Sequence, residues 1–261
     1  MKKLSCCFAV LFLIFSSCNS SIEENQNVPV GFLKRINNSG MFGTVAYDYF
    51  YEGNKISKVV SKHGTKRYIY TGNLITEIRS FNKNLSLLQK KTFHYNANDE
   101  LISASTLYYE SNLGYRQELV YNPDGTVLVK HFQGNLTSQN DFAYSELNYI
   151  EDNEIIKTVA TFSSGVLITT YEYDSGNNPM KYVTGYSKLN ILGKFGDNMY
   201  FILPNGNQRN CIKIVEEGEN IDCGIVGYSI SHNSTNFPAL YCSNELVTLC
   251  SDLPCYSFIY Q

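Results

Sequence analysis

Short runs of alternating apolar and polar residues, separated by turn-forming clusters, make up much of the chain. In Phe93-His94-Tyr95, for example, the two aromatic residues would face one way along a strand and the histidine the other. A period of two is typical of a half-buried β-strand. No 12-residue stretch shows a convincing amphipathic helical period. The pattern therefore predicts an all-β protein.

A tyrosine-rich unit recurs along these strands. In each copy a large apolar residue and a tyrosine flank one intervening residue, and turn residues and an aliphatic run follow, as in Tyr68-Ile69-Tyr70-Thr71-Gly72-Asn73-Leu74-Ile75. A sixth copy, Tyr171-Glu172-Tyr173, leads to Pro179-Met180, and a degenerate seventh begins near Tyr228. The closing tyrosine of the six clear copies stands at positions 51, 70, 95, 121, 149 and 173.

Each unit reads as a β-hairpin, because Gly-Asn and Pro-Asp-Gly clusters form tight turns. Six or seven hairpins supply about a dozen strands, and open sheets rarely exceed roughly ten strands without curling or splitting. We therefore expect an antiparallel meander that begins near Phe32 and forms a curled sheet, a sandwich or a barrel-like shell. The recurring aromatic residues are expected in the core rather than in a sugar-stacking site, because a ligand site is normally local.

The units resemble the tyrosine-rich YD repeats of RHS proteins, in the form found in flavobacterial (Bacteroidetes) lipoproteins of unknown function. The resemblance covers about residues 45–185 and implies an all-β shell of stacked hairpins. RHS proteins enclose a toxin domain in a large cocoon, for which this chain is too short. The resemblance implies no catalytic residues.

The first residues are those of a secretory signal. Lys2 and Lys3 precede an apolar stretch, residues 4–15, that is too short to span a bilayer as a helix. Phe15-Ser16-Ser17-Cys18 then resembles a bacterial lipobox, which predicts cleavage before Cys18 and acylation of its thiol. Several acyl chains on one residue would hold the protein firmly to a membrane.

Two further features indicate the destination of such a lipoprotein. Residue 19 is Asn rather than the Asp that resembles an inner-membrane retention signal, which favours the outer membrane of a Gram-negative bacterium. Glu23-Glu24 looks like the acidic export tag of Bacteroidetes surface lipoproteins, although a solvated tether explains it equally well. We expect a signal peptide at 1–17, a flexible tether at 18–30, repeated hairpins at 31–190, and a cysteine-bearing β region at 191–261 that continues the same domain.

The last region carries the cysteines that remain after export. Disulfides are the default outside the cytoplasm, and five thiols predict two disulfides and one free cysteine. Cys211 with Cys223 would suit neighbouring strands, and Cys242 could pair with Cys250 or Cys255, but spacing does not decide the connectivity. A zinc site is disfavoured because there is no Cys-x-x-Cys pair and the four histidines are scattered. The disulfide candidates are Cys211, Cys223, Cys242, Cys250 and Cys255.

Composition and the lack of known motifs exclude several classes of function. Hydrophobic residues make up 43% of the 261 residues, enough for a core, while the net charge of −3 argues against a nucleic-acid partner. No nucleotide-binding, zinc-hydrolase or serine-hydrolase motif is present, so no catalytic residue, metal or cofactor is predicted. Specificity is expected in the exposed turns, for instance at Asp124 and Asp174.

We therefore expect a non-catalytic lipoprotein, held in the membrane through Cys18, that binds a glycan or an envelope protein. Two alternatives stay open. One is an immunity- or inhibitor-type envelope lipoprotein, and the other is an extracellular hydrolase whose active site is assembled across strands without a sequence motif.

Overall fold

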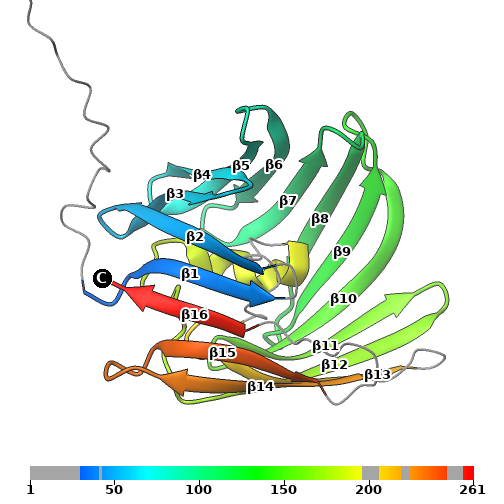
Figure 1. The fold of residues 1–261 in the computed structure, drawn as a ribbon. Coiled ribbons are helices and arrows are strands. Elements are labelled where there is room, and N and C mark those ends of the chain that lie inside the picture. Colours follow the sequence, from blue (N-terminus) through cyan, green and yellow to red (C-terminus); the bar gives the residue numbers. More distant parts are fainter. Residues whose placement is uncertain (1–29, 41–42, 196–205, 219–223, 246–254) are drawn as a thin grey trace, which may run out of the picture.

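The computed structural model describes residues 30–40, 43–195, 206–218, 224–245 and 255–261. Sixteen antiparallel strands form one closed barrel, in which every strand pairs with its neighbours in the chain and β1 pairs with β16 (Figure 1). This confirms the prediction of an all-β meander with a barrel-like shell. The strands are β1 (Leu33–Gly40), β2 (Gly43–Glu52), β3 (Lys55–Ser61), β4 (Gly64–Thr71), β5 (Leu74–Asn82), β6 (Leu87–Tyr95), β7 (Leu101–Tyr108), β8 (Leu113–Tyr121), β9 (Val127–Gly134), β10 (Asp141–Glu151), β11 (Glu154–Phe162), β12 (Gly165–Tyr173), β13 (Cys211–Gly218), β14 (Gly224–His232), β15 (Pro238–Glu245) and β16 (Cys255–Tyr260).

The repeated units form the hairpins β2–β3, β4–β5, β6–β7, β8–β9 and β10–β11. The predicted turn glycines Gly53, Gly72 and Gly125 all have positive φ, which a glycine adopts without steric cost. These five turns lie at the end of the barrel where the chain enters β1, and we call this the anchor end. The opposite end, which carries the turns after β3, β5, β7, β9 and β11, is called the far end.

A tyrosine hydroxyl links one hairpin to the next. In four of the six clear units, the closing tyrosine donates a hydrogen bond to the backbone carbonyl of an aliphatic residue at the first or second position of the preceding odd-numbered strand. The bonds are Tyr51 to Leu33 (2.8 Å), Tyr95 to Ile75 (2.8 Å), Tyr121 to Leu101 (3.1 Å) and Tyr173 to Ile155 (2.8 Å). We call this series the tyrosine ladder.

The fifth unit departs from the predicted register by one residue. Ile150, not Tyr149, pairs with the first aliphatic residue of the return strand, Ile155, after a bulge. The buried inward position, which Phe93 fills in the third unit, is therefore taken by Asn148. In this inward position the Asn148 side chain donates a hydrogen bond to the carbonyl of Ile191 and accepts one from Thr158 Oγ1 at 2.7 Å.

The sixth unit also departs from expectation. Pro179-Met180 does not return as a strand, because the chain leaves the sheet after Tyr173 and rejoins it only at Cys211 in β13. Within this insertion lies η1 (Tyr186–Phe195), a 3-10 helix inside the ring of strands (Figure 1). A proline has no backbone N–H to donate to a neighbouring strand, which agrees with the absence of a strand at Pro179.

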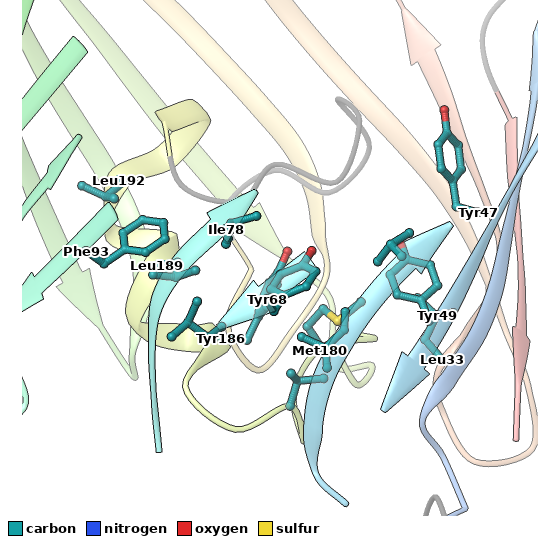
Figure 2. Close-up of a cluster of buried hydrophobic side chains, with 14 of the residues drawn as sticks. Leu33, Tyr47, Tyr49, Tyr68, Ile78, Phe93, Met180, Tyr186, Leu189 and Leu192 are labelled. Atoms are coloured by element: carbon teal, nitrogen blue, oxygen red, sulfur yellow. The ribbon is translucent and has the colours of Figure 1, made fainter. Parts of the chain in front are cut away.

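The insertion fills the barrel toward the anchor end. Met180, Tyr186, Leu189 and Leu192 pack in one hydrophobic cluster with inward side chains of β1 to β9, among them Tyr49, Tyr68 and Phe93 (Figure 2). The recurring aromatic residues of the first three units thus lie in this cluster or pack against it, as expected, whereas Tyr121 of the fourth unit is 39% exposed.

Two carboxylates hold the ends of the insertion. Asp174 accepts the backbone N–H groups of Gly176 (2.9 Å) and Asn210 (3.0 Å) and also contacts His232 Nε2 at 2.9 Å. Glu154 is fully buried and accepts three successive backbone N–H groups, those of residues 207–209, at 2.7 to 2.8 Å. Asp174 is therefore a structural anchor of the fold rather than a free turn residue that sets specificity.

The outer wall of the barrel is charged. Ion pairs join outward side chains in the middle of several strands, so that Arg35 meets Asp48, Arg116 meets Glu118, and Lys90 Nζ lies 3.3 Å from Glu77 Oε2. Lys213 and Glu172 form a similar pair at 2.6 Å between β13 and β12. The outer wall thus carries several ion pairs, together with exposed apolar side chains such as Ile102, Val120 and Ile259.

Candidate functional site

The inward face changes from apolar to polar along β6 to β10. On β8, Leu119 belongs to the hydrophobic cluster near the anchor end, whereas Gln117, two residues toward the far end, carries an amide. On β9, Val129 is followed in the same way by His131. We call the inward polar residues of this sector the polar belt; they are Lys91, Thr106, Tyr115, Gln117, His131, Tyr144 and Glu146.

Strand register brings these residues together. Gln117 lies directly opposite His131, which lies opposite Tyr144 across the next strand pair. Lys91 lies opposite Thr106, and Thr106 lies opposite Tyr115. Because side chains directly opposite in an antiparallel pair are about 5 Å apart, the belt is one continuous surface.

His131 and Tyr144 form the centre of the belt. Their rings stack at 4.2 Å between centroids, and Tyr144 stacks in turn on Phe162 at 4.6 Å. His131 Nε2 lies 3.1 Å from Glu146 Oε2. Burial, together with the neighbouring Glu146, raises the pKa of Tyr144 well above its usual value, so its phenol stays neutral.

Gln117 is the most unusual member of the belt. Its side chain is fully buried, yet among the described residues neither its amide nitrogen nor its amide oxygen has a hydrogen-bond partner. Leaving a buried amide unbonded costs about 1–3 kcal/mol for each group, so a folded protein normally avoids it.

Exposure rises from the belt toward the far end. On β8, Tyr115 is half-buried and Leu113 is 44% exposed; on β7, Tyr108 is 38% exposed. The β9–β10 loop packs closely against β8 here, since Arg116 Nε donates to the Gln139 carbonyl and a Cβ on Gly114 would lie 2.3 Å from the Asn135 carbonyl oxygen. The exposure of inward side chains on these strands thus increases toward the far end.

The structure gives two of the scattered histidines a carboxylate partner. His131 contacts Glu146 and His232 contacts Asp174, across 15 and 58 residues of sequence. Such partners are invisible in the sequence because strand pairing sets them. The one available signal for the belt is strand alternation, which puts Gln117 and His131 on the same face as the buried Leu119 and Val129.

The predicted cysteine sites fall into two groups. Cys18, Cys223 and Cys250 lie outside the described residues. Cys242 and Cys255, opposite each other on β15 and β16, form a disulfide. Cys211, at the start of β13, is buried and forms no disulfide with a described cysteine. Its suggested pairing with Cys223, which lies outside the described residues, stays a prediction.

Cys211 does not have the properties of a nucleophile. Burial raises the pKa of its thiol to about 12, and the reactive form of a cysteine is the thiolate. In the part of the chain that the structure describes, no group of three or more His, Cys, Asp or Glu side chains is placed to hold a metal ion. Among the same residues, no helix is long and apolar enough to cross a membrane.

Comparison with known proteins identifies the fold. No protein-family model matches the chain, and no curated protein matches it. A porin-like protein from Bacteroides vulgatus superposes with a TM-score of 0.58 at 13% identity, over 88% of this chain and 98% of that one. A porin-like protein from Bacteroides uniformis gives a TM-score of 0.56 at 7% identity, over 90% of this chain and 100% of that one. The chain therefore shares the barrel fold of porin-like proteins from Bacteroides.

Proposed function

We propose that this chain is a lipoprotein of the outer membrane whose barrel stands in water, held by acylated Cys18, and binds a ligand through its far end. The porin-like neighbours support an outer-membrane location and a non-catalytic role. The cysteine at the end of the signal supports anchoring by acyl chains rather than by the barrel wall.

The observation that carries this proposal is the polarity of the barrel. A barrel embedded in lipid presents an apolar band about 25 Å tall on its outer face and a polar interior. Here the outer face carries ion pairs such as Lys90 with Glu77 in the middle of its strands, and the interior toward the anchor end is hydrophobic. An Arg or Lys facing lipid at the midplane costs about 2–4 kcal/mol, so a wall with several of them is unfavourable in a bilayer.

The entry point of the chain orients the barrel. Residues 18–30 can span at most about 45 Å, since an extended chain covers about 3.5 Å per residue. They join β1 at the anchor end, beside the C-terminus (Figure 1). The far end, with the polar belt behind it, then points away from the membrane.

Membrane fractionation of Cys18→Ala tests the anchor and the position of the barrel together. Wild-type protein is expected in the detergent phase and to incorporate labelled fatty acid. The variant should lose the label and appear folded in the aqueous phase. Ser17→Ala, which keeps a small residue before the cysteine, is the matched control and should behave as wild type. A folded Cys18→Ala protein that stays in the membrane would show that the wall itself is embedded and would refute the proposal.

A further inference from the structure

We infer that the polar belt binds a small neutral sugar, with the amide of Gln117 as the group that recognises its hydroxyls. This inference rests on the proposed function, because it names the ligand class for the far-end site of that binding protein. It is carried by the buried amide, the stacked rings and the balance of charge around them.

The amide of Gln117 can be satisfied only by a partner that both donates and accepts hydrogen bonds. Its nitrogen has two hydrogens to donate and its oxygen has two lone pairs, and all are unused in a fully buried side chain. A pair of neighbouring sugar hydroxyls supplies both functions, since a hydroxyl donates and accepts. A bound molecule that hydrogen-bonds to the amide would explain why the folded protein keeps this group buried without a partner of its own.

The surroundings of Gln117 favour a ring with apolar faces. His131, opposite Gln117, stacks on Tyr144, which stacks on Phe162. Both faces of the Tyr144 ring are covered by this stack, so the face left to the C–H side of a pyranose is the outer one of Phe162, the more exposed of the two end rings.

The charges of the belt favour a neutral ligand. The belt holds one lysine, Lys91, and one glutamate, Glu146, so its own formal charges balance, and the buried Lys66 of β4 lies outside it. Glu146 also lies beside His131 at 3.1 Å, where its carboxylate can accept a hydrogen bond from a sugar hydroxyl with its remaining lone pairs.

The test is calorimetric titration of the full acylated chain, kept in a detergent without a sugar headgroup. The probes are glucose, galactose, N-acetylglucosamine, lactose, cellobiose and N,N′-diacetylchitobiose. At least one should bind, and Gln117→Met, which keeps the length of the side chain without its amide, should weaken that binding at least tenfold. The thermal midpoint of Gln117→Met should equal or exceed that of wild type, because the substitution removes an unbonded buried amide.

Gln208→Leu is the matched control, because its side chain lies at the anchor end and its backbone N–H, not its amide, contacts Glu154. It should leave sugar affinity unchanged. A deoxy analogue of the bound sugar that lacks the recognised hydroxyl should also bind at least tenfold more weakly, since it leaves the amide unbonded.

The outcomes separate this inference from the proposed function. If no probe binds, or if Gln117→Met binds as tightly as wild type, the sugar assignment is wrong, whatever the fractionation of Cys18→Ala shows. If Gln117→Met does not fold, nuclear magnetic resonance of the Gln117 amide in wild type decides. A shift of that signal on sugar addition supports the inference, and an unchanged signal overturns it.

Discussion

At the residue scale, the hydroxyl of the closing tyrosine explains why the repeat needs tyrosine rather than phenylalanine. The ring fills the core, and the hydroxyl bonds a backbone carbonyl of the neighbouring hairpin, as Tyr51 does with Leu33 and Tyr95 with Ile75. A buried carbonyl without a partner is costly, so each tyrosine of the ladder both packs and satisfies the backbone.

Tyr51→Phe tests this role of the hydroxyl. We expect it to lower the free energy of unfolding by about 1–3 kcal/mol, because the Leu33 carbonyl loses its bond while the ring is kept. Urea unfolding followed by circular dichroism measures the change. Tyr109→Phe, at an exposed position outside the ladder, is the control and should stay within about 0.5 kcal/mol of wild type. Equal stability of the two variants would contradict the role assigned to the ladder.

At the scale of elements, the inserted segment fills space in the barrel interior that the inward side chains of the strands are too short to fill. A barrel of sixteen strands is wide enough to leave an open channel unless something fills it. Here η1 and the residues before it occupy the interior toward the anchor end, and Asn148 holds the segment through the carbonyl of Ile191. The fifth unit, which is shifted by one residue, thus contacts the insertion through Asn148.

Leu189→Ala tests whether the insertion is part of the core. Leu189 is fully buried in the hydrophobic cluster, so truncation should cost about 2–5 kcal/mol, from lost transfer energy and a residual cavity. Leu85→Ala, at a position that is 68% exposed on the β5–β6 turn, is the control and should change the stability by less than about 0.5 kcal/mol. The difference in thermal midpoint between the two variants is the measurement; equal midpoints would mean that the insertion packs loosely.

At the scale of the whole molecule, the barrel depends on tyrosines that must stay neutral. Burial raises the pKa of Tyr171 to about 12 and raises those of several others, including Tyr51 and Tyr241, above their usual value. In the unfolded chain a tyrosine ionises near pH 10. Above that pH the unfolded chain therefore releases protons that the folded chain retains, and rising pH favours unfolding.

Stability should consequently be nearly constant between about pH 7 and 9 and fall steeply above about pH 10. For each tyrosine, the loss is about 1.4 kcal/mol per unit by which its folded pKa exceeds the unfolded one. Urea midpoints from pH 7 to 11, with absorbance at 295 nm to follow phenolate formation, measure the effect. The buried tyrosines with a raised pKa, such as Tyr171, should ionise together with unfolding. A folded protein in which every tyrosine ionises without loss of structure would contradict their burial.

The sequence by itself was sufficient for the strands, the turns and the meander. Alternation and turn chemistry are local properties, and consecutive hairpins pair with their chain neighbours, so Phe93, Tyr95 and Gly125 lie where the pattern predicts. The sequence also predicted that recurring aromatic side chains such as Phe93 lie in the hydrophobic core. Acylation at Cys18 stays a prediction from the sequence, since that residue lies outside the described part of the chain.

Tertiary structure alone decided the closure of the sheet, the course of the insertion and the polar belt. Closure depends on β1 meeting β16 across more than two hundred residues, for which no local signal exists. The fifth unit is shifted by one residue at Asn148 although β10–β11 has the same bulge as β2–β3, and a slip of one residue exchanges the two faces of a strand. Gln117, His131 and Tyr144 look unrelated in sequence, and only the register of three neighbouring strands makes them one surface.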